Sequence, residues 1–147
     1  MNARTMAITA LLAAALMNPA QPAWACAGVE ASDAWLREAP PGATMMAGYV
    51  TLTNRGDHPR AVRAVRSPDF SSVEIHRTTI ENGEAHMEAL ERLPIPAHGE
   101  AKLQPGGAHL MLFEPAKPLK AGDSVTLNLY CGRQKPMAVP FTVRAAP

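Results

Sequence analysis

The chain is poor in the residue types that mark several large classes of protein. Only two of its 147 residues are cysteine, and aromatic residues make up 5%. Lys and Arg are scattered and the formal net charge is +1, so the basic patch or stripe of a nucleic-acid-binding protein is missing. Beyond residue 25, no segment approaches the roughly 18 uninterrupted apolar residues of a membrane-spanning helix.

Signature motifs of the common enzyme classes are also missing. The sequence has no Gly-x-Ser-x-Gly elbow, no His-Glu-x-x-His motif, no phosphate-binding glycine-rich loop and no Cys-x-x-Cys redox pair. We therefore expect a protein that is not an enzyme and that cannot reduce another protein's disulfide by itself.

The first 25 residues have the composition of a secretory signal peptide. Arg4 supplies a positive n-region, Met6 to Met17 form a short apolar stretch, and Ala23-Trp24-Ala25 fits the small-x-small rule for cleavage. We predict a signal peptide at residues 1–25, a mature chain that starts at Cys26, and a periplasmic location. A lipoprotein acylated at Cys26 is the alternative, but the residues before it match the lipoprotein pattern poorly.

Residues 26–147 are enough for one domain with a hydrophobic core and too few for two. Fourteen Pro and ten Gly are spread between short alternating segments, a pattern typical of an all-β sandwich or barrel. Strands are expected near Gly28–Arg37, Met45–Asn54, Arg60–Ser67, Ser71–Ile80, Glu84–Leu90, Glu100–Leu103, Ala108–Phe113, Ser124–Cys131 and Met137–Arg144.

A β-hairpin is predicted around Asn82-Gly83, the dipeptide that favours a two-residue type I′ turn. With this turn at its centre, Thr78 lies opposite Met87. Met87 and His76 then share one face as diagonal neighbours, roughly 7–8 Å apart at the backbone. His86 falls on the other face, so we do not expect it to act together with them.

A second pair of side chains, His109 and Met111, lies in the apolar run Ala108–Phe113 after the turn Gln104-Pro105-Gly106-Gly107. Residues i and i+2 of a strand point the same way, so these two side chains project together while Leu110 faces the opposite side. A helix would separate them by about 200° of arc.

The donor set of His76, Met87, His109 and Met111 suits a soft metal ion. Thioether sulfur is a soft, uncharged ligand that suits Cu(I), and imidazole is acceptable to it. Zinc sites use Cys, His, Asp or Glu instead. A single methionine on a strand is more often core filler, but the four residues together predict one Cu(I) site. Four uncharged ligands leave the charge of the ion uncompensated, which suits firm but releasable binding.

The spacing His76-x10-Met87-x21-His109-x-Met111 resembles the signature of the periplasmic copper chaperone family called PCuAC. The resemblance covers nearly the whole mature chain, in the expected order. Its further blocks are Asp33-Ala34-Trp35-Leu36-Arg37, Gly48-Tyr49-Val50-Thr51-Leu52-Thr53-Asn54, Val73-Glu74-Ile75-His76, Pro105-Gly106-Gly107-Ala108-His109-Leu110-Met111-Leu112 and Pro118-Leu119-Lys120-Ala121-Gly122-Asp123.

The resemblance implies a cupredoxin-like Greek-key β-sandwich in which His76, Met87, His109 and Met111 match the four Cu(I) ligands of the family. It also implies delivery of Cu(I) to the binuclear copper centre of cytochrome c oxidase. A partner dithiol protein would be needed to keep the cysteines of that acceptor subunit reduced. Two alternatives stay open: a periplasmic copper buffering or resistance protein, and an exported interaction module in which the four residues are incidental.

The second copper site that some relatives hold in a His- and Met-rich C-terminal tail is not expected here, because only Met137 lies near the end. Met45 and Met46 precede a strand and should point to opposite faces, with ordinary packing as the expected role. His58 and His98 lie in turn sequences and are expected at the surface.

Cys26 and Cys131 are the only cysteines, and an exported protein can keep them as a disulfide. Cys131 continues the apolar alternation of its strand and should point inward. The alternative is that cleavage after Ala27 removes Cys26 and leaves Cys131 as a buried thiol.

Blue-copper electron transfer is not expected. Such a site needs a Cys thiolate with two His and an axial Met, and no His stands between Cys131 and Met137.

Overall fold

The computed structural model describes residues 26–133 and 135–146. The predicted signal peptide lies outside them. Within these residues every regular element is a strand, and no helix of a length and apolarity suited to crossing a bilayer is found. The strands are β1 (Val29–Arg37), β2 (Met45–Asn54), β3 (Arg60–Val62), β4 (Ala64–Arg66), β5 (Phe70–Glu81), β6 (Glu84–Ala89), β7 (Leu93–Ile95), β8 (Glu100–Leu103), β9 (Ala108–Pro115), β10 (Ser124–Tyr130) and β11 (Met137–Arg144).

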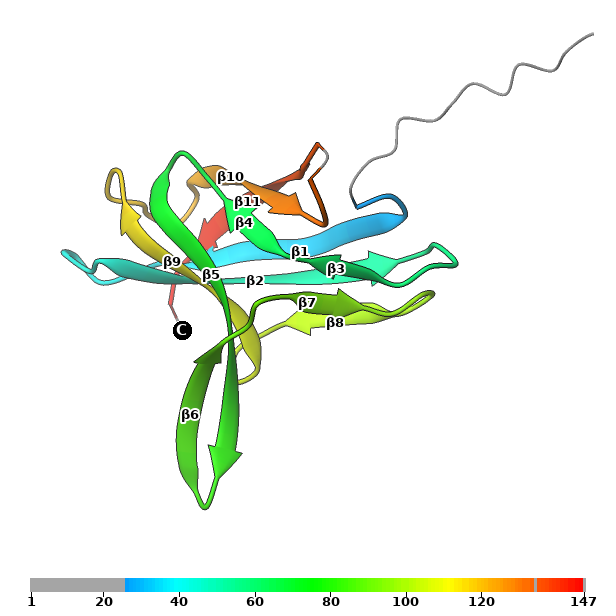
Figure 1. Cartoon of the computed structure of the whole chain (residues 1–147). Coiled ribbons are helices and arrows are strands. Elements are labelled where there is room, and N and C mark those ends of the chain that lie inside the picture. The colour runs from blue at the N-terminus through cyan, green and yellow to red at the C-terminus, as the bar shows by residue number, and fades with distance from the viewer. Residues whose placement is uncertain (1–25, 134, 147) are drawn as a thin grey trace, which may run out of the picture.

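Nine of these strands form one strongly curved sheet in the order β4-β10-β11-β1-β2-β8-β9-β5-β6, and β4 also pairs with β5. That extra pairing closes the sheet on itself and leaves β6 outside the closed part (Figure 1). Most neighbours are antiparallel, but the N-terminal β1 runs parallel to the C-terminal β11. The predicted all-β sandwich or barrel is therefore confirmed.

Apolar residues that alternate along each strand fill the interior of the closed sheet, as a period of two requires. β10 is an example, because Val125, Leu127 and Leu129 are buried while the residues between them are not. The apolar residues with less than 2% of their surface exposed are Leu36, Val50, Leu52, Val62, Ile95, Leu110, Leu112, Leu127, Leu129, Phe141 and Val143.

Two strand predictions were wrong, and both concern the small two-stranded sheet of β3 and β7. The expected strand Arg60–Ser67 is broken at Arg63 into β3 and β4, because β3 pairs with β7 in a separate two-stranded sheet while β4 pairs with β10. The strand β7 was not expected. It is only three residues long and contains Pro94, which lacks the N–H donor that a central strand needs.

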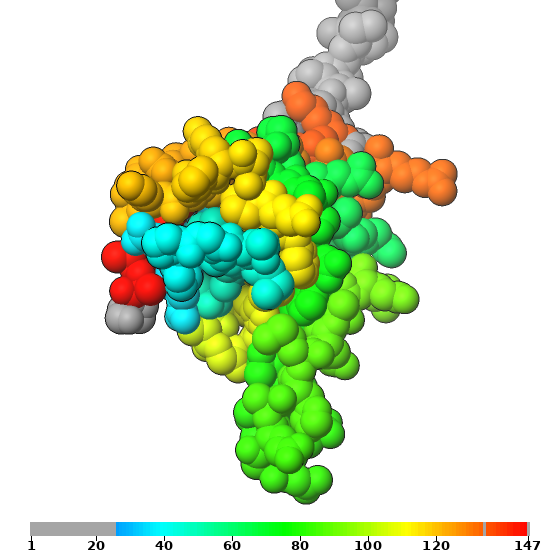
Figure 2. All heavy atoms as spheres, turned by 90° about the vertical axis from the view of Figure 1, so that its left-hand side faces the viewer, coloured from blue at the N-terminus to red at the C-terminus, as the bar shows by residue number. Residues whose placement is uncertain are grey.

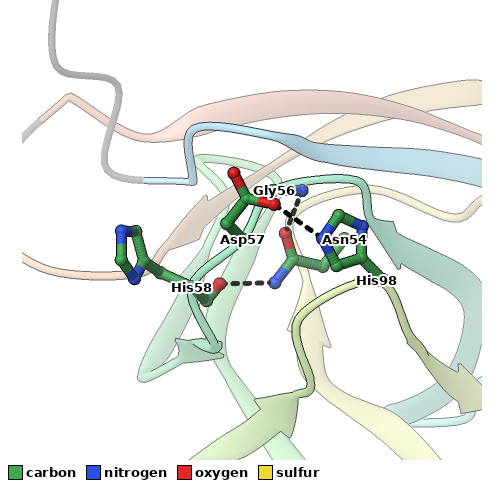
Figure 3. Close-up of polar contacts among 5 residues, drawn as sticks. All are labelled: Asn54, Gly56, Asp57, His58 and His98. Atoms are coloured by element: carbon green, nitrogen blue, oxygen red, sulfur yellow. Dashed lines mark hydrogen bonds and ion pairs between the residues drawn. The ribbon is translucent and has the colours of Figure 1, made fainter.

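The end of the molecule that carries this small sheet is held by polar contacts of Asn54 (Figure 3). Asn54 is fully buried, and its Nδ2 donates to the carbonyl oxygens of His58 (2.8 Å) and Ile95 (3.3 Å). His58 and His98 lie in loops, as predicted, and the exposed ring of His98 contacts Asp57 through Nε2 at 2.7 Å.

Cys26 and Cys131 form a disulfide with a Cα–Cα distance of 5.2 Å. The bridge fastens the segment before β1 to the residue after β10, and both cysteines pack against the hydrophobic core. The structure thus contains the bridge that the sequence left as one of two alternatives.

Candidate metal centre

The predicted hairpin exists and extends away from the body of the protein (Figure 1). Asn82 and Gly83 both have positive φ angles, 52° and 82°, as the central residues of a type I′ turn require. The register places Thr78 opposite Met87 and His76 opposite Ala89, as the turn predicts. All six residues of β6 are exposed, and the space-filling view shows the hairpin projecting by itself (Figure 2).

The predicted ligands from the two parts of the chain meet because β5 pairs with β9. His76 is directly opposite His109, and Glu74 is directly opposite Met111. Residues directly opposite on one face have Cβ atoms about 4.5–5.5 Å apart. Ile75 and Leu110, which alternate with these residues, are buried in the core. His76, His109 and Met111 therefore share the other face of the sheet, at the end of the β5–β9 ladder from which the hairpin leaves.

The four side chains differ in their exposure to solvent. His109 is 7% exposed and Met87 is 57% exposed. His76 and Met111 are intermediate. The arrangement is thus closed at His109 on β9 and open at Met87 on β6.

Hydrogen bonding fixes the orientation of the His109 ring. Its Nδ1 lies 3.0 Å from the carbonyl oxygen of Gly107. A carbonyl oxygen can only accept, so in the neutral ring Nδ1 carries the proton and Nε2 carries the lone pair. A backbone carbonyl in this position is the usual partner of a metal-binding histidine.

The His76 ring has the opposite arrangement. Its Nε2 lies 2.8 Å from a carboxylate oxygen of Glu74, while its Nδ1 is buried and has no hydrogen-bond partner. A buried polar atom without a partner is uncommon in native proteins and calls for an explanation, such as an ion that occupies the position.

The two imidazole rings have the separation expected of ligands that share an ion. Their centroids are 6.0 Å apart with an interplanar angle of 49°. A first-row metal such as zinc lies about 2.0–2.1 Å from an imidazole nitrogen, which puts each ring centroid about 3 Å from the ion and two centroids at most about 6 Å apart. The observed separation is therefore at the upper end of the range for two rings that share one ion.

The other candidates from the sequence lie elsewhere. His86 pairs with Thr79 on the face of the hairpin opposite to Met87. Met46 is buried in the core, as expected from ordinary packing, whereas Met45 is 48% exposed on the face that carries Met111. In the described part of the chain, no three His, Cys, Asp or Glu side chains are grouped so that they could hold a metal ion. The two histidines therefore need the methionines to complete a ligand set.

Glu74 is the residue of this centre that the sequence-based prediction missed. The alternation along β5 was a sufficient signal, because residues 74 and 76 of one strand face the same way.

A cavity of about 710 Å³ lies away from the centre, between the loop Glu38–Thr44 and the segment Glu114–Lys120, and none of the four predicted ligands lines it.

Comparison with known families gives one match that covers most of the chain. The sequence model of the family described as "Putative lipoprotein LpqE-like" matches residues 29–143. A protein of Leifsonia xyli subsp. xyli, named "Putative lipoprotein Lxx21020", is 39% identical over 116 residues, which are 77% of this chain and 69% of that protein.

Solved structures of copper-binding domains have the same fold. The copper-bound PCuAC domain from PmoF2 superposes with a TM-score of 0.69 at 23% identity, covering 81% of this chain and 94% of the domain. The Cu(I) form of DR1885 from Deinococcus radiodurans superposes with a TM-score of 0.61 at 32% identity, covering 79% of this chain and 76% of that protein. The fold is therefore that of a PCuAC domain, which confirms the cupredoxin-like β-sandwich.

Proposed function

Since the chain belongs to the LpqE-like family and has the fold of a PCuAC domain, we propose that it is a copper chaperone that binds one Cu(I) ion through His76, Met87, His109 and Met111. The observation that carries this proposal is the facing pair of imidazoles. Their centroids are 6.0 Å apart, and one of the rings has a buried nitrogen without any partner.

The chemistry of the donors favours Cu(I) over other ions. Two imidazoles and two thioethers form a soft and uncharged set, and carboxylates or carbonyls, which Mg²⁺ and Ca²⁺ prefer, do not belong to it. Thioethers also bind copper without the oxidation-prone thiolate that an exported protein cannot easily keep reduced. The Cu(I) form of DR1885, which is 32% identical, supports the same ion for this chain.

The disulfide argues against blue-copper electron transfer. A blue-copper site needs a Cys thiolate as a metal ligand. Both cysteines of the chain are joined to each other, and no free cysteine occurs in the described residues. Cu(I) has a filled d shell, so the protein loaded with Cu(I) is expected to be colourless.

Delivery to an acceptor is the second part of the proposal. Met87 is 57% exposed, so a partner can reach the ion from the hairpin side and replace one ligand at a time. We propose the copper-binding subunit of cytochrome c oxidase as the acceptor, on the resemblance to the PCuAC family. Transfer runs downhill if the acceptor supplies thiolates, and a separate dithiol protein keeps them reduced.

We also propose that the protein is exported to the periplasm through a signal peptide at residues 1–25 and that residues 26–147 form its single chaperone domain. The disulfide supports an oxidising compartment. A Cys26 sulfur held in this bridge has no valence left for the thioether link of a lipoprotein. Intact mass measurement of the mature protein, with and without reduction, distinguishes the disulfide from a lipid at Cys26.

The test of copper binding is an anaerobic titration of Cu(I) against a colorimetric chelator. The mature wild type is compared with His109→Ala and Met111→Leu, and Met45→Leu is the matched control because Met45 lies on the same face but outside the proposed ligand set. We expect one equivalent bound by the wild type and by Met45→Leu, and much weaker binding by the other two. Equal competition by all four proteins would mean an exported binding module without a metal site.

A transfer experiment separates delivery from buffering. The Cu(I)-loaded protein is mixed with the reduced, metal-free copper domain of the oxidase subunit, and the metal content of each is measured after separation. Movement of copper to the acceptor supports delivery, and retention by the chaperone supports buffering.

A further inference from the structure

The neighbourhood of His76 contains a charged residue that the four-ligand arrangement does not explain. The side chain of Glu74 is half exposed and could extend into water, yet its carboxylate lies 2.8 Å from Nε2 of His76, whose own side chain is 16% exposed. Glu74 therefore makes a defined contact with the more buried partner.

This contact decides which nitrogen of His76 is free. A carboxylate only accepts hydrogen bonds, so the neutral ring carries its proton on Nε2 and its lone pair on Nδ1. That Nδ1 atom is buried and unpartnered. For His109 the carbonyl of Gly107 produces the reverse tautomer, with the lone pair on Nε2. The two facing rings thus present different nitrogens.

We propose that Glu74 is a positioning residue for copper binding, which holds the Nε2–H of His76 so that Nδ1 of His76, together with Nε2 of His109, binds the Cu(I) ion. This inference rests on the proposed function. Histidines that bind metals commonly donate their other N–H to a carboxylate or a carbonyl oxygen, which sets the tautomer and raises the basicity of the ligand nitrogen.

The carboxylate also changes the charge balance of the centre. The four proposed ligands are neutral and leave the charge of Cu(I) uncompensated. Glu74 lies one hydrogen bond away from a ligand and directly opposite Met111 in the β5–β9 register. An opposite charge at this distance, in a partly buried position, stabilises the bound ion without coordinating it.

Three variants separate the hydrogen bond from the charge. Glu74→Ala removes both, and Glu74→Gln removes the charge but keeps a carbonyl oxygen that can accept from Nε2–H. Glu88→Ala is the matched control, because Glu88 is an exposed hairpin residue that pairs with Arg77 on the face opposite to His76. Circular dichroism and thermal unfolding establish that each variant is folded.

Two measurements are made on each protein: Cu(I) affinity by chelator competition, and the tautomers of the imidazoles by long-range ¹H–¹⁵N NMR of the metal-free protein. We expect Glu74→Ala to lose about 10–100-fold in affinity and His76 to lose its single Nε2–H tautomer. Glu74→Gln is expected to keep the tautomer and to lose less affinity than Glu74→Ala, because it lacks only the charge. His109 is an internal reference, because its bond to Gly107 is unchanged in every variant.

The outcomes distinguish this inference from the function on which it rests. A wild type that binds no Cu(I) refutes the chaperone function and the role of Glu74 together. Wild-type binding with equal affinity for Glu74→Ala and Glu88→Ala refutes only the role of Glu74. Tighter binding by Glu74→Ala would also overturn it, because Glu74 would then compete with copper for Nε2.

Discussion

Removal of the disulfide should cost the protein a large part of its stability without affecting the metal centre. The bridge joins residues 105 positions apart, so it constrains nearly the whole described chain in the unfolded state. The perturbation is the double substitution Cys26→Ala and Cys131→Ala. Alanine is preferable to serine because Cys26 is 4% exposed and a hydroxyl there would be buried.

The length of the closed loop sets the magnitude. The chain-entropy treatment gives about 4.7 kcal/mol for a loop of about 100 residues, while measured values are typically about 2–4 kcal/mol. With an unfolding entropy of about 2.1 cal/mol/K per residue, a loss of about 3 kcal/mol lowers the Tm of a domain of about 120 residues by roughly 12 °C.

Urea denaturation and calorimetry of the oxidised wild type and the double variant measure this loss. The m-value should rise in the variant, because the unfolded chain without the bridge exposes more surface. Cu(I) affinity should be unchanged, since the four proposed ligands lie on β5, β6 and β9, and neither cysteine belongs to these strands. A Tm within a few degrees of the wild type, together with an unchanged m-value, would refute the reasoning.

Three further substitutions have separable effects. Met87→Leu should change the free energy of unfolding by no more than about 0.5 kcal/mol, because the side chain is 57% exposed. It should weaken Cu(I) binding by about tenfold, or 1.4 kcal/mol. A loss of stability without a loss of affinity would contradict the role of Met87 as a ligand. Asn54→Ala removes the donors to the carbonyl oxygens of His58 and Ile95 and should lower the free energy of unfolding, measured by urea denaturation, by about 2–4 kcal/mol. A loss smaller than about 1 kcal/mol would show that these contacts contribute little. In Gly83→Ala the added Cβ meets no neighbouring atom, but the residue has a φ of +82°. The substitution should therefore lower the Tm modestly, through about 1 kcal/mol of backbone strain. An unchanged Tm would indicate that the turn adopts another conformation.

The hairpin register was predictable because its determinants are local. Asn82-Gly83 favours one turn type, that turn fixes which residues are opposite, and the structure has the same pairs. The facing of His76 and His109 was not predictable in the same way. It depends on the pairing of β5 with β9, strands separated in sequence by β6, β7 and β8, and local pattern does not determine such a pairing.

The errors concern segments in which local preference is weak. β7 has three residues and a proline, so neither alternation nor β propensity identifies it. Contacts from distant parts of the chain order it, namely the pairing with β3 and the hydrogen bond from Asn54 to Ile95. Arg60–Ser67 was expected to be one strand, but its Arg-Ala-Val sequence repeats every three residues, which is not the period of two of a half-buried strand. The backbone N–H of Arg63 donates to the carbonyl of Tyr130, and the chain changes its partner there. Pairing across the fold therefore decides where these two strands begin and end.

The hairpin gives the proposed copper ligands unequal mechanical support. β9 has neighbours on both sides, β2 or β8 on one and β5 on the other, whereas β6 is held by β5 alone and is exposed along its whole length. Segments with few buried contacts open at a lower free energy than the core. Amide protons of β6 should therefore exchange faster than those of β9, and Met87 can leave the ion through local opening while His109 and Met111 stay in place.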